Sequence, residues 1–345
     1  MPALWKLQGF DAPARTDLPG DTVQAMFWHA VQRRGDAVMM RQKELGIWRG
    51  WSWREVGAIV RELACGLASL GVQPGDCVSI LSNTRVEWVW CDLATLSAGG
   101  VSNGIYPTDA APQVEYLCAD SSTVVLVVED EEQLDKALEV RDRLPRLRYI
   151  VVIDPTGLAG FSDPQVLTLA ALRERGARHD REHPEVFQQR LDSRTAEDLA
   201  ILIYTSGTTG KPKGAMHNHR GLLTVVRGQL DQLPQDERDE RMCFLPLCHV
   251  AERVVGLYAA LYSGTRMNFV ENPDTVPENV REIAPTVFGG VPRLWEKFYS
   301  AVTLAVRDAG AVQQAMYRLA IGIGHRAADA VLAGRPVGPG LKLAY

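Results

Sequence analysis

The sequence predicts an α/β protein built on stacked, mostly parallel β-sheets that are flanked by helices. Short apolar runs typical of buried strands alternate with segments that carry apolar residues at helical spacing. Glycine or proline stands at many of the junctions between the two kinds of segment. The 345 residues are also enough for two or more subdomains, each with a core of its own.

The composition is that of an ordinary soluble globular protein, with 46% apolar and 23% charged residues. A net charge of −5 gives no reason to expect a nucleic-acid partner. The six cysteines show no C-x-x-C spacing, so we expect reduced thiols in a cytoplasmic protein. The start does not read as a signal peptide, and no run approaches the ~20 apolar residues of a transmembrane segment. Peripheral membrane contact and a homodimer are left open.

The first elements have recognisable boundaries. A helix is expected over residues 22–34 with Asp21 as its N-cap, followed by a hairpin over residues 38–51. The helix over residues 52–70 has the clearest apolar face, and Ser52 begins a capping box.

The alternation of strands and helices then continues along the chain. Residues 154–194 have no clear pattern and many charges, so a solvated connection is expected there. The other expected strands cover residues 77–81, 122–128, 149–153, 199–203 and 264–270. The other expected helices cover residues 83–96, 129–144, 222–233, 254–261, 278–283 and 300–333.

The most informative stretch directly follows the strand expected at residues 199–203. Residues 204–214 read YTSGTTGKPKG, so that hydroxyls and glycines precede two lysines. Hydroxyls donate hydrogen bonds, and glycine lets successive backbone N–H groups form an anion-binding nest. These groups suit a polyphosphate. The stretch is not a Walker A loop, because Pro212 stands where that loop has its Mg²⁺-binding Ser or Thr.

This stretch is similar to the phosphate loop of the AMP-forming acyl-adenylate family, whose Tyr-Thr-Ser-Gly-Thr-Thr-Gly-x-Pro-Lys-Gly pattern it matches without a break. Residues 70–81, 104–117 and 289–297 resemble segments of the long-chain fatty acid–CoA ligases within that family. Residues 245–253, LPLCHVAER, resemble the motif whose histidine lies beside the acyl carboxylate. The resemblance covers nearly the whole chain, but only the first part of the family's catalytic unit.

The resemblance implies a reaction and a set of site residues. A fatty acid would attack the α-phosphate of ATP to give acyl-AMP, and CoA would then displace AMP. His249 would orient the acyl carboxylate, Lys213 would supply positive charge, and Thr205 would bind Mg²⁺ and phosphate. We take His249 and Lys213 as the candidate catalytic residues. The remaining phosphate contacts would come from Ser206, Gly207, Thr208, Thr209, Gly210 and Lys211, of which Lys211 stands at a variable position of the family pattern.

The resemblance also implies the domain organisation, which is that of the large N-terminal domain of acyl-adenylate-forming enzymes, incomplete at the C-terminus. A first α/β subdomain would span residues 1–194, and a second, truncated subdomain with the phosphate loop would span residues 195–345. The family's Tyr-Gly-x-Thr-Glu motif does not occur in these 345 residues, and we expect the mobile C-terminal domain to be absent from them. Because adenylate formation needs preorganised donors and cations around the phosphates, we expect this chain alone to be inactive.

Other interpretations fit the same residues. The phosphate loop is shared across the family, so the acid could be aromatic or medium-chain, and the truncated chain could be a non-catalytic nucleotide- or acyl-binding remnant. His217 and His219 could touch phosphate, cap a helix or face solvent. Glu252 and Arg253 are expected to form a structural ion pair.

Overall fold

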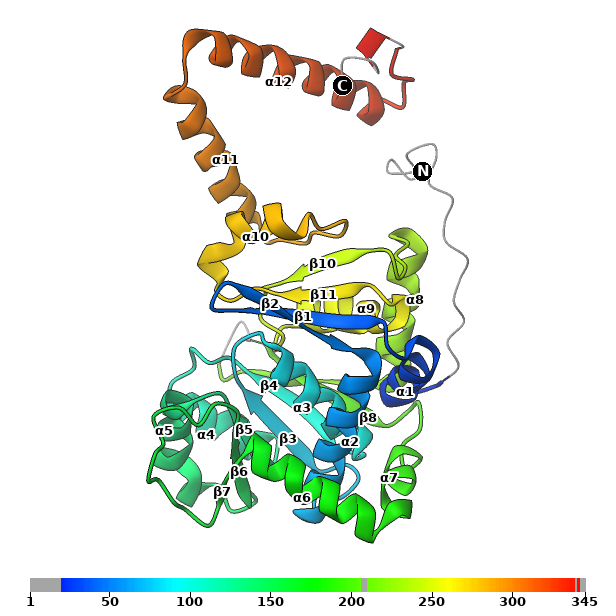
Figure 1. The fold of residues 1–345 in the computed structure, drawn as a ribbon, viewed down its shortest axis with the longest axis vertical. Helices are drawn as coiled ribbons and strands as arrows, with labels where there is room; N and C mark the ends of the chain where they lie inside the picture. Colours follow the sequence, from blue (N-terminus) through cyan, green and yellow to red (C-terminus); the bar gives the residue numbers. More distant parts are fainter. Residues whose placement is uncertain (1–19, 206–209, 339, 342–345) are drawn as a thin grey trace. The chain divides into compact units, whose positions relative to one another are not determined.

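The computed structural model describes residues 20–205, 210–338 and 340–341. They belong to two compact units, which divide between Phe288 and Gly289. The larger unit contains two β-sheets with helices packed against them (Figure 1). Parallel pairing predominates in its larger sheet, so the predicted fold class is confirmed.

The larger sheet has seven strands in the order β7-β6-β5-β3-β4-β8-β9. Its neighbouring strands are parallel except for β8 and β9, which form an antiparallel pair at one edge. Every residue of β3, β4 and β5 is buried, as expected for strands covered on both faces. The strands are β3 (Cys77–Leu81), β4 (Val101–Ile105), β5 (Thr123–Val128), β6 (Tyr149–Val152), β7 (Val166–Thr168), β8 (Leu199–Thr205) and β9 (Lys213–Asn218).

The smaller sheet has four strands in the order β10-β11-β1-β2. The predicted hairpin is confirmed as β1 and β2, and β1 also pairs in parallel with β11. Both sheets contain strands from each side of residue 194, where the sequence placed a subdomain boundary; that boundary stays a prediction. The strands are β1 (Val38–Glu44), β2 (Ile47–Ser52), β10 (Glu240–Cys243) and β11 (Arg266–Phe269).

Local sequence signals account for several helix ends. Helix α2 begins with the predicted capping box, because the Glu55 N–H donates to Ser52 Oγ at 3.2 Å and the Ser52 N–H donates to Glu55 Oε2 at 2.7 Å. The N-cap of α1 is Thr22 and not Asp21, since Thr22 Oγ1 accepts the Ala25 N–H. The helices are α1 (Val23–Arg34), α2 (Trp53–Ser69), α3 (Val86–Ser97), α4 (Ala111–Asp120), α5 (Glu131–Val140), α8 (His219–Gln232), α9 (Ala259–Ser263) and α10 (Val276–Ile283), with a π-helix, η2 (Ala251–Tyr258), directly before α9.

The expectation of a solvated connection over residues 154–194 is wrong. This segment contains β7 and the helices α6 (Leu169–Glu182) and α7 (Pro184–Leu191), and α6 lies along α2 (Figure 1). Glycine allows the two helices to approach closely, because a Cβ on Gly176 would lie 1.7 Å from the Glu62 carbonyl oxygen. The helix carries few apolar residues, so its packing was not evident from periodicity.

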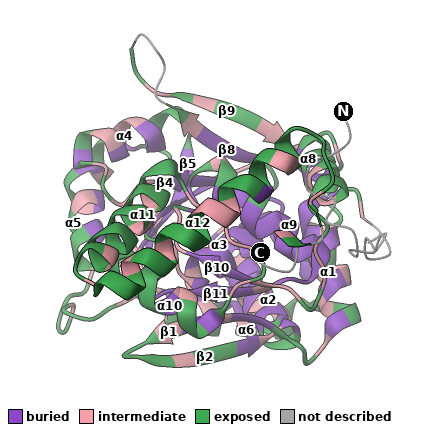
Figure 2. Cartoon of the chain, turned by 90° about the horizontal axis from the view of Figure 1, so that it is seen from above, coloured by how far each residue is buried: buried purple, intermediate pink, exposed green. Residues whose placement is uncertain are grey.

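The smaller unit, as far as it is described, consists mainly of α11 (Pro292–Arg307) and α12 (Ala311–Leu332). The helical region predicted over residues 300–333 is therefore divided, and Gly310 stands directly before α12. Figure 2 shows mostly exposed and intermediate residues on both helices, and Ala327 is their buried residue. Among the described residues, no helix combines the length and apolar character needed to cross a membrane.

The close packing of α2 and α6 leads to a stability prediction. Gly176→Ala should lower the free energy of unfolding by about 1–3 kcal/mol, because the added methyl group meets backbone that cannot move aside without separating the helices. Urea unfolding measures the change. The control is Gly228→Ala in α8, where a Cβ meets nothing within 4 Å and should stabilise slightly. Equal stability of the two variants would contradict the close packing.

Candidate active site

The predicted phosphate loop connects the paired strands β8 and β9 at the edge of the large sheet. Because β8 runs parallel to β4, Thr205 lies at the carboxyl end of the sheet, where open α/β folds bind their ligands. Thr205, Gly210, Lys211 and Lys213 are all exposed. The other predicted phosphate contacts, Ser206, Gly207, Thr208 and Thr209, lie outside the described residues.

Two tyrosines attach the base of this hairpin to helix α4. The Tyr116 hydroxyl donates to the Pro212 carbonyl at 2.8 Å, and its ring centroid lies 4.8 Å from Lys211 Nζ. The Tyr204 hydroxyl donates to Asp120 Oδ2 at 2.7 Å. Burial and this bond raise the pKa of Tyr204. Lys211 is therefore held over an aromatic ring, while Lys213 has no such contact among the interactions of the described residues.

His249 lies in the turn directly before the π-helix η2. Its N–H donates to the Pro246 carbonyl at 3.0 Å, and its Nδ1 accepts the Ala251 N–H at 3.1 Å. Because Nδ1 is an acceptor, the neutral ring carries its proton on Nε2. The exposed ring therefore offers a hydrogen-bond donor, which suits a carboxylate.

Close packing against β4 sets the position of the residue before this histidine. A Cβ on Gly104 would lie 2.7 Å from Cys248 Cα, so only glycine allows this approach. Burial, with a smaller contribution from Cys248, raises the pKa of Tyr106 to about 12. Burial also raises the pKa of Cys248 to about 12, so its thiol stays protonated at neutral pH. All six cysteines are free and buried.

The two histidines after the loop have different positions. His219 is 1% exposed, and its Nδ1 accepts the Val23 N–H at 3.2 Å, so it is a core residue and not a phosphate contact. Burial lowers the pKa of His219 to about 4. His217 lies half-buried on β9, and burial lowers its pKa as well. The cap of α8 is Asn218, whose Oδ1 accepts the Gly221 N–H.

Glu252 and Arg253 do not form the predicted ion pair with each other. Glu252 pairs with Arg241 at 2.6 Å, and Arg253 pairs with Asp92. Adjacent residues of a helix point in different directions, so each reaches a different neighbouring element. The two charges are structural, as predicted, but the partner of Glu252 lies 11 positions away and that of Arg253 lies 161 positions away.

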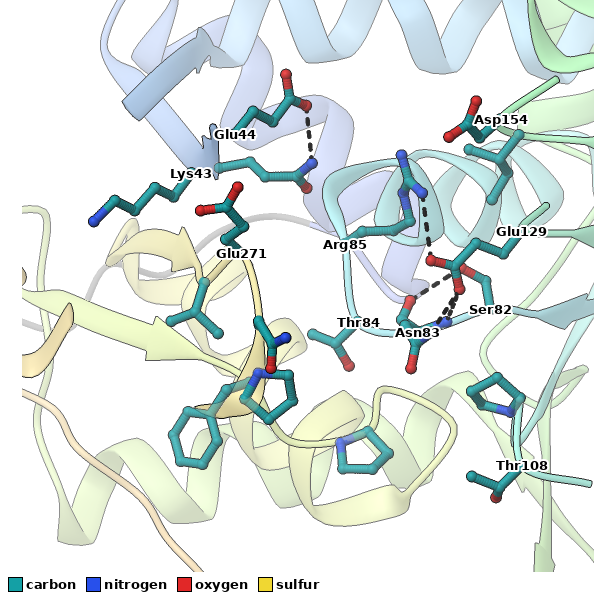
Figure 3. Close-up of a pocket in the computed structure, with 18 of the residues that line it drawn as sticks. Lys43, Glu44, Ser82, Asn83, Thr84, Arg85, Thr108, Glu129, Asp154 and Glu271 are labelled. Atoms are coloured by element: carbon teal, nitrogen blue, oxygen red, sulfur yellow. Dashed lines mark hydrogen bonds and ion pairs between the residues drawn. The ribbon is translucent and has the colours of Figure 1, made fainter. Parts of the chain in front are cut away.

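A pocket of about 840 Å³ with both polar and apolar side chains in its lining lies where the carboxyl ends of both sheets meet (Figure 3). Glu129 is central to it, accepting the Asn83 N–H at 2.6 Å and pairing with Arg85 at 3.4 Å. Phe244 and Pro246 connect its wall to the segment that carries His249. No motif in the sequence marks this pocket, although several of its lining residues directly follow strands. They include Ser82, Asn83, Thr84, Arg85, Tyr106, Pro107, Thr108, Glu129, Ile153 and Asp154.

The predicted Mg²⁺ site rests on one side chain. The Thr205 hydroxyl supplies one neutral oxygen, whereas Mg²⁺ prefers six oxygen ligands. No group of three or more His, Cys, Asp or Glu side chains within the described part of the chain is placed to hold a metal ion. Thr205 thus fits Mg²⁺ only as one ligand beside phosphate oxygens and water.

The parallel sheets, the edge hairpin and the histidine turn together correspond to the fold of adenylate-forming enzymes. The chain belongs to the AMP-binding enzyme family, whose pattern matches residues 27–343. It is 34% identical to a long-chain-fatty-acid–CoA ligase of Mycobacterium bovis, covering 84% of this chain and 47% of that protein. It is 30% identical to a long-chain-fatty-acid–CoA ligase of Rattus norvegicus, covering 90% of this chain and 43% of that protein. The chain thus spans about half the length of these relatives.

Solved structures share the fold at lower identity. The didomain of a carboxylic acid reductase from Segniliparus rugosus, in complex with AMP, has a TM-score of 0.69 at 22% identity and covers 97% of this chain and 51% of that one. An anthranilate CoA ligase in complex with anthranoyl-AMP has a TM-score of 0.67 at 23% identity and covers 77% of this chain and 49% of that one.

The buried His219 makes stability depend on pH. Its folded pKa of about 4 lies below the ordinary value of 6.5, so the unfolded chain binds the proton more tightly. The stability that the neutral His219 contributes is fully present above pH 6.5 and is lost as the pH falls toward 4. Between pH 7 and pH 5 the free energy of unfolding should fall by about 2 kcal/mol more in the wild type than in the His219→Asn variant, as measured by urea unfolding. If the free energy of unfolding falls equally in the wild type and the variant, His219 is not held neutral in the folded protein.

Proposed function

We propose that a protein containing this chain is an AMP-forming long-chain fatty acid–CoA ligase that acts in the cytoplasm. The single observation that carries the proposal is the β8–β9 hairpin, which has the phosphate-loop sequence over residues 204–214 and exposes Thr205, Gly210, Lys211 and Lys213 at the carboxyl end of the large sheet. The relatives named as long-chain-fatty-acid–CoA ligases support the choice of acid.

The hairpin supplies the polyphosphate contacts in this proposal. Thr205 and Lys213 are direct partners in the β8–β9 register, so their side chains lie on the same face of the hairpin. A hydroxyl and an ammonium group therefore flank the loop at its base. Lys213 stabilises negative charge on the phosphates, and the loop hydroxyls and N–H groups, including that of Gly210, donate to the phosphate oxygens.

His249 holds the acid in this proposal. Its Nε2–H donates to one carboxylate oxygen and orients the other toward the α-phosphate of ATP. The attack gives acyl-AMP and pyrophosphate, and the thiol of CoA then displaces AMP. The pocket of Figure 3 is lined by charged and amide side chains together with apolar ones such as Ile153, Phe244 and Val270, so the lining alone does not assign it to the polar part of a substrate or to an acyl tail.

Mg²⁺, where bound with ATP, would neutralise phosphate charge, with the Thr205 hydroxyl as one ligand. The residues of this chain otherwise bind and orient the two reactants. The preorganised groups on the far side of the phosphates would come from the part of the family's catalytic unit that this chain does not include.

The two lysines of the loop provide a matched test. In a polypeptide that completes the catalytic unit, Lys213→Met should lower kcat/KM for ATP about 100-fold, because an ammonium group directed at developing phosphate charge is lost. Lys211→Met should have an effect of less than about 5-fold, since Lys211 rests on the Tyr116 ring. Acid-dependent exchange of labelled pyrophosphate into ATP measures both, and equal effects would contradict the assignment.

The same exchange assay tests the substrate class. With a panel of long-chain, medium-chain and aromatic acids, kcat/KM should be highest for the long-chain acids. A higher kcat/KM for another class of acid would contradict the assignment of long-chain fatty acids as substrates. The 345 residues alone should bind ATP in a calorimetric titration yet catalyse no exchange. Absence of ATP binding together with absence of exchange by the completed polypeptide would reject the ligase function.

A further inference from the structure

We infer that Arg253 is a positioning residue for His249, acting through its buried pair with Asp92. The chemical significance of this inference rests on the proposed function of His249, whereas the contacts themselves do not. No motif in the sequence indicates the partner of Arg253, because Asp92 lies 161 positions away.

The Arg253 side chain is enclosed completely. Arg253 and Asp92 are both 0% exposed, and the guanidinium donates to Asp92 Oδ1 and to the Ser102 carbonyl. The Tyr258 hydroxyl donates to Asp92 Oδ2 at 2.9 Å, and the Trp88 ring centroid lies 5.0 Å from Arg253 Cζ. One side chain therefore joins the π-helix η2 to helix α3 and strand β4.

The backbone of the same residue contacts the histidine. The Arg253 N–H donates to the His249 carbonyl at 3.0 Å, while the Ala251 N–H donates to His249 Nδ1 at 3.1 Å. Both donors belong to the first turn of η2, whose place against β4 and α3 depends on the Arg253 side chain. A shift of this turn would move the carbonyl and the Nδ1 contact together.

The π-helical geometry is consistent with a positioning function. A π-helix is rare, and one that persists over eight residues requires neighbours that hold it in place. Its two consecutive charges are paired on different sides, Glu252 with Arg241 of β10 and Arg253 with Asp92 of α3. The segment after His249 thus connects the small sheet to the large one.

The second ion pair provides a matched control. Glu252 and Arg241 are also buried; Glu252 lies on the same π-helix, and Arg241 lies on β10 of the small sheet. Among the described residues, neither side chain forms a hydrogen bond with the His249 turn. Removing this pair should loosen the link to the small sheet and leave the bond from Ala251 to the His249 ring in place.

The test compares double variants, because removing one partner alone leaves a buried charge unpaired and endangers folding. Arg253→Met with Asp92→Asn should keep a cooperative thermal transition. It should also speed hydrogen exchange at the Ala251 amide by roughly tenfold or more. Nitrogen NMR of the His249 imidazole should change from the Nε2–H tautomer alone to a mixture with the Nδ1–H tautomer. The control variant, Glu252→Gln with Arg241→Met, should leave both signals as in the wild type.

The outcomes separate positioning from general stability. If Arg253→Met with Asp92→Asn folds and leaves the His249 tautomer and the Ala251 exchange rate unchanged, Arg253 does not position the histidine. If the control pair shifts both signals equally, the effect is general loosening and the inference is also overturned. Neither measurement uses catalysis, so failure of the proposed function, seen in the exchange assay, is distinguishable from failure of this inference.

Discussion

The geometry of the site depends on the buried ion pair between Arg253 and Asp92. Two charges without exposed surface are costly to place in a protein interior unless they are hydrogen-bonded, and here the Tyr258 hydroxyl and the Ser102 carbonyl bond to the pair. Arg253 Nη1 is buried without a hydrogen-bond partner among the described residues. The requirement for these partners fixes where the π-helix lies against α3 and β4. Because His249 directly precedes that helix, a constraint in the core determines the position of an exposed polar side chain.

The features that sequence predicted well are those with local causes. The capping box at Ser52 and the hairpin turn at Gly46 depend on residues a few positions apart. Strand β5 was evident because a run of valines buried on both faces has few alternatives. The phosphate-loop sequence stands out because its hydroxyls, glycines and lysines are contiguous, and strands β8 and β9 lie on either side of it at the edge of the sheet; its binding of phosphate stays a prediction.

The features that sequence missed depend on long-range partners. Helix α6 packs through Gly176 against α2, and its Arg173 and Asp180 pair with charged residues of α2, so its face does not read as apolar. Glu252 and Arg253 were correctly expected to be structural, but a sequence cannot show that adjacent charges have different partners. The pocket of Figure 3 was missed for the same reason, since Glu129, Asn83 and Glu271 come together only when both sheets form.

Strand β4 contacts both the strand that leads into the proposed phosphate loop and the segment that carries His249. On one side it pairs with β8, through Ser102 with Ile201 and Asn103 with Leu202, and β8 leads directly into the phosphate loop. At Gly104 it touches Cys248, next to the histidine, and the Ser102 carbonyl accepts a bond from Arg253. An in-line displacement requires the carboxylate and the phosphate to be aligned to a fraction of an ångström. In the proposed reaction, the alignment of the two reactants therefore depends on a central strand that contacts both supports.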